Sequence, residues 1–157
     1  MKKILLIIAI ALTTTFTMNA QDISENAIGV RFGSNDGFGG EISYQRKLSE
    51  TNRLELDLGW RNNASTDAYK LTGIYQWVWT LGDQFNWYAG FGGGIGNWKN
   101  KEIDSSQTLL FAAGNIGIEF DLDIPLLISL DYRPEIGFNK IYDGLNSDIA
   151  LGLRYQF

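Results

Sequence analysis

Paired carboxylates are the residues of this sequence whose types and spacing could do chemistry. Glu55 and Asp57 are separated by one residue, and so are Asp121 and Asp123. Two such groups on one face could act as an acid and base pair or bind Ca²⁺ through their oxygens. Glu55 and Asp57 alternate with leucines, as in a strand, whereas Asp121 to Pro125 has the composition of a turn. We therefore interpret the first pair as partners of basic side chains and the second as turn residues.

Histidine and cysteine are both absent from the 157 residues. Histidine is the side chain best suited to general acid and base catalysis near neutral pH. Cysteine would be needed for a disulfide or a thiolate metal site. The glycine-rich run Gly90 to Gly96 is not followed by the Lys-Ser or Lys-Thr of a phosphate loop. We therefore expect no enzymatic activity, no cofactor and no metal, and we assign no catalytic, cofactor-binding or metal-ligating residue.

The first twenty residues are typical of a secretory signal peptide. Lys2 and Lys3 precede an apolar run from Ile4 to Leu12, and a small residue, Ala20, ends the segment. The run is too short for a transmembrane helix, which needs about 20 apolar residues. We predict cleavage of residues 1–20, which leaves 21–157 as one domain with 11 basic and 18 acidic residues, a formal charge of −7. Such a chain is a poor nucleic-acid binder.

The mature chain alternates apolar and polar residues with a period of two, which predicts strands rather than helices. The predicted strands cover residues 28–32, 38–45, 54–61, 69–81, 85–96, 110–120, 128–133 and 148–157. The longest of them, 69–81, 85–96, 110–120 and 148–157, are long enough for a tilted bilayer crossing, which needs about 9 to 11 residues. We predict an all-β fold: an eight-stranded antiparallel up-and-down transmembrane β-barrel. Its outer loops would be Asn62 to Asp67, Lys99 to Gln107 and Glu135 to Asp143.

Alternation alone does not show which face meets lipid, since a soluble lipocalin-like barrel places the same apolar face inward around a ligand. The aromatic residues favour a membrane barrel, because they sort into two belts. One belt, at the predicted periplasmic ends, comprises Tyr44, Trp77, Trp79, Phe85, Trp87, Phe120, Tyr155 and Phe157. The other, at the opposite ends, comprises Phe32, Phe38, Trp60, Tyr69 and Tyr132.

The polar face carries nearly balanced charges, which also favours a membrane barrel. The residues predicted to point inward are Arg31, Arg61, Lys70, Arg133 and Arg154 with Glu41, Glu55, Asp57, Glu119, Asp131 and Asp148. The interior of an eight-stranded barrel is just wide enough to be filled by side chains, and buried charges must be paired. We predict that ion pairs plug the lumen. The alternate glycines of 90–96 would leave room for long Arg and Glu side chains from across the barrel.

The chain resembles the small outer-membrane β-barrel family of Gram-negative bacteria typified by the OmpA membrane domain and OmpX, which belongs among the porin-type barrels. The resemblance is carried by residues 124–134, IPLLISLDYRP, and by the alternating end from Ile149 to an aromatic last residue. It implies a location in the outer membrane among lipid and lipopolysaccharide. It also implies insertion by the barrel assembly machinery, which would recognise the last strand through Leu151, Leu153, Tyr155 and Phe157. No peptidoglycan-binding domain follows the barrel in this sequence.

Barrel size and charge pairing favour a structural or surface-interaction role with the loops facing outside. A small-solute channel and a soluble ligand-binding barrel stay open as alternatives. The sequence does not name a surface partner, which we expect to contact the outer loops.

Overall fold

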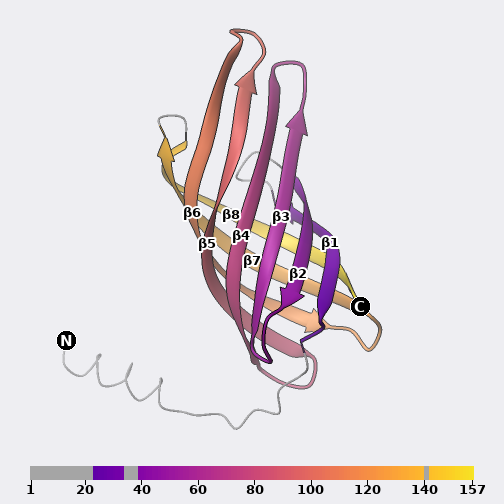
Figure 1. Ribbon diagram of the computed structural model, residues 1–157. Coiled ribbons are helices and arrows are strands. Elements are labelled where there is room, and N and C mark those ends of the chain that lie inside the picture. Colours follow the sequence, from indigo (N-terminus) through magenta and orange to yellow (C-terminus); the bar gives the residue numbers. More distant parts are fainter. Residues whose placement is uncertain (1–22, 34–38, 140–141) are drawn as a thin grey trace, which may run out of the picture.

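The chain forms a closed antiparallel barrel of eight strands in which each strand pairs with the next and β1 pairs with β8 (Figure 1). The computed structural model describes residues 23–33, 39–139 and 142–157. The strands are β1 Asn26–Gly33, β2 Gly40–Lys47, β3 Asn52–Asn62, β4 Thr66–Thr80, β5 Phe85–Asn100, β6 Ser105–Asp121, β7 Leu126–Asn139 and β8 Tyr142–Gln156. The predicted eight-stranded all-β fold is confirmed. The predicted signal peptide (1–20), the turn at 34–37 and Phe38 lie outside the described residues.

The described part contains no helix long and apolar enough to cross a membrane.

The predicted loops are much shorter in the structure, because the strands continue through them. β3 runs to Asn62 and β4 begins at Thr66, and the turn between β5 and β6 comprises only residues 101–104. The predicted third loop, from Glu135 to Asp143, is mostly strand, since the β7–β8 pairing reaches Asn139 and Tyr142. Polar residues do not end these strands, since cross-strand hydrogen bonds satisfy the backbone of each hairpin and polar side chains are favourable wherever water is near.

Strand lengths differ around the barrel, which makes one rim uneven. β1 and β2 have 8 residues each, whereas β5 and β6 have 16 and 17. Figure 1 shows the β3–β4 and β5–β6 hairpins projecting together above the rest of the barrel. The opposite end is level, with short turns and the C-terminus.

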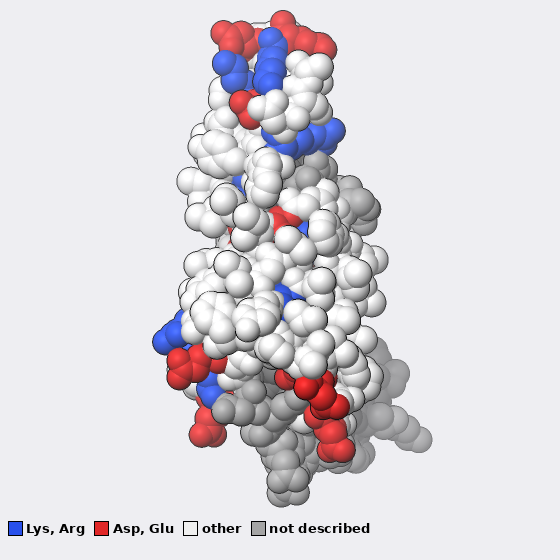
Figure 2. Space-filling view, turned by 90° about the vertical axis from the view of Figure 1, so that its right-hand side faces the viewer, with Lys and Arg blue, Asp and Glu red and all other residues white. Residues whose placement is uncertain are grey.

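The barrel is apolar outside and polar inside, as predicted. On β3, Leu56 and Leu58 point outward and are 38% and 44% exposed, whereas Glu55 and Asp57 between them are buried. On β5 the outward apolar run extends from Phe85 to Ile95. Ten residue steps in a tilted strand span roughly 25 Å, the height of the apolar band of a membrane barrel. Figure 2 shows this band as a mostly white middle between charged ends.

Aromatic side chains gather at the level end of the barrel, as the first predicted belt requires. Trp79 stacks on Trp87 with ring centroids 4.3 Å apart, and Phe85 lies 4.7 Å from Phe120. The second belt is less regular. Trp60 and Tyr69 face each other near the ends of β3 and β4, but placing Tyr132 at a strand end was wrong, because β7 continues to Asn139.

The glycines of β5 have a different role from the predicted one. A Cβ atom added at Gly92 or Gly96 would overlap the backbone carbonyl oxygen of Gly73 or Tyr69 on β4, and one at Gly94 would overlap the Phe111 ring. These positions allow the β4 backbone and the Phe111 ring to approach closely, whereas the prediction had long charged side chains from across the barrel in this space.

Candidate functional site

The lumen is the candidate functional site, because it collects the buried charges of the molecule. Ten of the eleven charged residues predicted to point inward are buried there. The exception is Arg61, which is partly exposed near the end of β3, with its guanidinium carbon 5.8 Å from the Trp98 ring centroid. Sequence reasoning missed Arg53 and Glu135, which are buried in the lumen. They had been assigned to a turn and a loop, although both have the inward parity of their strands.

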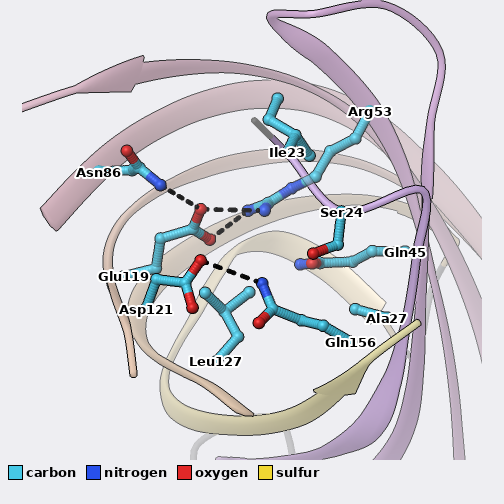
Figure 3. Close-up of a pocket in the computed structure, with 10 residues that line it drawn as sticks. All are labelled: Ile23, Ser24, Ala27, Gln45, Arg53, Asn86, Glu119, Asp121, Leu127 and Gln156. Atoms are coloured by element: carbon cyan, nitrogen blue, oxygen red, sulfur yellow. Dashed lines mark hydrogen bonds and ion pairs between the residues drawn. The ribbon is translucent and has the colours of Figure 1, made fainter. Parts of the chain in front are cut away.

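At the level end of the barrel, Arg53 and Glu119 form a bidentate ion pair (Figure 3). Arg53 Nη1 and Nη2 donate to Glu119 Oε1 and Oε2 at 3.1 and 2.7 Å, and Arg53 Nε donates to Gln76 Oε1 at 2.6 Å. Asn86 Nδ2 also donates to Glu119, at 3.2 Å. The cavity that these side chains line has a volume of about 10 Å³, which is room for one water molecule. This end of the lumen is therefore tightly packed.

Arg154 forms the next layer from the last strand. Its Nε and Nη1 donate to the hydroxyls of Ser43 and Ser129 at 2.9 and 2.8 Å, and its Nη2 donates to Glu55 at 3.1 Å. Gln45 Nε2 donates to the same oxygen of Glu55 at 2.6 Å. The layer joins four strands, β2, β3, β7 and β8, through one guanidinium and one carboxylate.

Arg133 links this layer to the carboxylates above it. Its Nη2 lies 2.7 Å from Glu55 Oε1 and 2.6 Å from Asp57 Oδ2, and its Nη1 lies 3.5 Å from Glu41. The interpretation of Glu55 and Asp57 as partners of basic side chains is confirmed. Of the second pair, only Asp123 is the turn residue that was predicted, and it accepts from Gln84 at 3.0 Å. Asp121 is the last residue of β6, lines the same cavity as Arg53 and Glu119, and accepts from Gln156 at 3.3 Å.

Arg31 and Lys70 complete the network toward the projecting hairpins. Arg31 contacts Asp131, Asp148 and Glu41 at 2.7, 2.9 and 3.0 Å. Lys70 Nζ lies 3.2 Å from Glu135 and 3.4 Å from Glu41. Among the residues that the structure describes, five basic and seven acidic side chains are buried in the lumen. Among the described residues, no three acidic side chains converge as a metal site.

Small apolar clusters lie above and beside the charges. Ile74, Phe111 and Ala113 form one cluster, and Phe111 also lies 5.6 Å from Lys70 Nζ. Nearer the hairpin tips, Ala68 and Leu109 pack with Trp98 on the inner face of the projecting strands. Charge pairs and apolar clusters together fill the interior, as expected for eight strands.

Comparisons with known proteins show which solved structures share the fold of this barrel. No protein-family model matches the chain, and no curated protein matches it. The N-terminal β-barrel domain of Pseudomonas aeruginosa OprF superposes with a TM-score of 0.67 at 16% identity, over 86% of this chain and 100% of that one. Neisserial surface protein A gives 0.60 at 14% identity, over 84% and 94%. The fold is that of a small outer-membrane β-barrel.

A third barrel of this fold is Ail, the attachment invasion locus protein of Yersinia pestis, solved in complex with the heparin analogue sucrose octasulfate. It gives a TM-score of 0.57 at 16% identity, over 85% of this chain and 97% of that one. At these identities the similarity concerns architecture. It does not transfer a partner from one barrel to another.

Outer-membrane barrels have short periplasmic turns and longer outer hairpins, and in this barrel the β3–β4 and β5–β6 hairpins project beyond the rest (Figure 1). Their tips are bonded to each other. Lys101 N donates to Ser65 O at 2.8 Å, and Lys101 Nζ donates to Asn62 Oδ1 and Asn63 O at 3.1 and 2.9 Å. The β3–β4 and β5–β6 tips therefore present one joint surface.

The tip of β5–β6 is held by an exposed ion pair. Lys99 Nζ lies 2.8 Å from Asp104, whose φ of 46° lies in the left-handed region. The hydrogen bond and the positive charge of Lys99 lower the pKa of Asp104. Both groups are in water, so the pair contributes little to stability.

Proposed function

We propose that this chain is an integral outer-membrane barrel with a structural or surface-interaction role, whose outer hairpins contact partners while its lumen stays closed. The observation that supports this most directly is the set of five buried basic side chains, each paired with at least one carboxylate across the lumen. A solute could pass only if these pairs were broken and their charges left unpaired, which is costly.

The soluble ligand-binding alternative does not fit the structure. A lipocalin-like barrel needs an apolar cavity, whereas Asp57, Lys70 and Arg133 are fully buried inside this one and its leucines face outward. The channel alternative is tested by conductance. Protein in planar bilayers should give no stable, large conductance, and reproducible steps of porin size would favour the channel.

The orientation is tested by labelling in intact cells. Residue 105 begins β6 at the outer tip, and residue 52 begins β3 at the opposite end. A cysteine introduced by Ser105→Cys should react with an impermeant maleimide, and one introduced by Asn52→Cys should not. Equal labelling of both would contradict the orientation.

The partner surface is tested by replacing the joint tip while keeping the barrel. Replacement of residues 63–65 and 101–104 by short glycine-containing turns should abolish cell-surface crosslinks and leave heat-modifiable folding unchanged. Basic and acidic residues lie together at this surface, with Lys99 and Lys101 beside Glu102 and Asp104. Such a mixed surface favours a partner of mixed charge over a polyanion such as the heparin analogue of Ail. Sucrose octasulfate is therefore the negative control.

Export and assembly belong to the same proposal. Residues 1–20 would be removed as a signal peptide, so N-terminal sequencing of the protein from outer membranes should begin at Gln21. The last strand presents Leu151, Leu153, Tyr155 and Phe157 outward, each between 44% and 61% exposed. If the barrel assembly machinery recognises this strand, Phe157→Ala should reduce assembly in cells. Refolding of the same variant into lipid vesicles should be nearly unchanged.

A further inference from the structure

Arg46 is a basic side chain on the outward face of the barrel, at its level end. On β2, Ser43 and Gln45 point into the lumen and are buried. Tyr44 and Arg46 alternate with them and therefore point outward. The side chain of Arg46 is 50% exposed. Because a charge on the lipid-facing side of a barrel is costly within the hydrocarbon, an arginine on this face extends toward the polar edge of the bilayer.

Aromatic side chains lie around Arg46 on this face. Arg46 is opposite Asn26 on β1, and the backbone of Asn26 is bonded in turn to Phe157, which follows β8. The rings of Tyr155 and Phe157 are stacked with centroids 6.4 Å apart. Aromatic belts of membrane proteins lie at the level of the lipid headgroups. Arg46 therefore lies at the depth of the phosphate groups.

The guanidinium of Arg46 is held by one end only. Asn26 Oδ1 accepts from the Tyr44 hydroxyl at 2.7 Å and from Arg46 Nη1 at 2.8 Å. Glu25 Oε2 lies 3.8 Å from the same Nη1, in an exposed pair of the kind that contributes little to stability. Both contacts of Arg46 with the described residues thus involve Nη1, and the edge formed by Nε and Nη2 faces the surroundings.

We propose that Arg46 binds the phosphate of a phospholipid headgroup in the leaflet at the level end of the barrel. The Nε and Nη2 edge presents two parallel N–H groups, which is the geometry with which arginine binds two oxygens of one phosphate. The neighbouring rings suit the boundary between the headgroup and the acyl chains of the same lipid. The inference rests on the proposed membrane location and goes beyond it by naming a lipid site.

Native mass spectrometry of the barrel released from detergent micelles tests the site, with phosphatidylglycerol titrated as the probe. Arg46→Gln should weaken binding of the first phosphatidylglycerol at least about tenfold, the loss of a hydrogen bond between charged groups. Arg46 takes part in no buried ion pair, so this variant should fold normally. Arg61→Gln, the same change at a partly exposed arginine near the other end of β3, is the matched control and should bind as the original chain does. Glu25→Gln should tighten binding, because it removes a negative charge beside the phosphate.

Two further probes identify the group that is recognised. A betaine lipid, which has the glycerol and acyl chains but no phosphate, should bind the original chain and Arg46→Gln equally. Inorganic phosphate in excess should not displace phosphatidylglycerol, because it lacks the acyl chains that contact the barrel. Displacement would show a site for free phosphate and would overturn the proposal.

The proposal would also be overturned if Arg46→Gln bound phosphatidylglycerol as tightly as the original chain, or if it lost affinity for the betaine lipid to the same extent. Labelling in intact cells and refolding into vesicles test the membrane location separately, so failure here leaves the proposed function in place. A chain that does not fold into vesicles at all would instead contradict the proposed function.

Discussion

The bilayer-spanning part of the barrel and its projecting hairpins are built from the same strands with opposite polarity. In the spanning part of β3, leucines face outward and Glu55 and Asp57 face inward. Beyond Trp60 and Tyr69 the pattern reverses. Asp67, Lys99 and Thr108 face outward, whereas Ala68, Trp98 and Leu109 pack together on the inner face. The medium outside the sheet therefore decides which face is apolar, and it changes from lipid to water along a single strand.

The largest effect should come from breaking the charge network of the spanning part. Arg133→Met would leave Glu55, Asp57 and Glu41 without their shared guanidinium, and removal of one partner from a buried ion pair costs about 3 to 5 kcal/mol. We expect a large fall in the urea midpoint for refolding into lipid vesicles. A midpoint within error of the original chain would show that the network does not stabilise the barrel.

The same substitution on the outward face should have different effects in the two regions. Leu56→Arg places a charge against acyl chains and should cost about 2 to 4 kcal/mol near the midplane. Thr108→Arg, on the outward face of β6 above the bilayer, should change stability by less than about 0.5 kcal/mol. Vesicle refolding in urea measures both. If Leu56→Arg folded as well as Thr108→Arg, the outward face of β3 would not meet lipid.

The inner face of the hairpins should behave like a small soluble core. Leu109 is 1% exposed and packs with Ala68 and Trp98. Leu109→Ala should open the projecting strands locally, since they are a separate cooperative region from the barrel below. Hydrogen exchange should increase at 105–110, and the urea midpoint of the barrel should stay unchanged. Unchanged exchange at these amides would argue against an apolar core in the hairpins.

The smallest effect should come from the tip. Asp104→Asn removes the ion pair with Lys99 and keeps a residue that tolerates the left-handed backbone conformation. Because the pKa of Asp104 is lowered in the fold, its contribution is present above the pKa of an unfolded aspartate and is lost as pH falls. Protease sensitivity of the tip should therefore increase slightly in acid for the original chain, and the variant should show no such pH dependence.

Much of the fold and the site could be predicted from local pattern. The period of two places Glu55 and Asp57 on one face and their leucine neighbours on the other, because alternate side chains of a strand point to opposite sides. Ile74 and Val78 follow the same rule as apolar residues on the inward face of β4. It failed where strand ends were judged from polarity, because outside the bilayer a polar residue does not end a strand. For that reason Arg53 was assigned to a turn and Glu135 to a loop, and neither was predicted to be buried in the lumen.

The sequence by itself determined the number of strands, the face that each side chain occupies and the charged character of the interior, since these follow from alternation along each strand. Only the tertiary structure decided which charges meet. Arg31 pairs with Asp131, 100 residues away, and Arg133 with Asp57, 76 residues away. These pairs depend on the register carried around the closed barrel, and a shift of one strand would exchange every partner. Closure also left Arg61 partly exposed near the end of β3 and brought the two hairpin tips into contact.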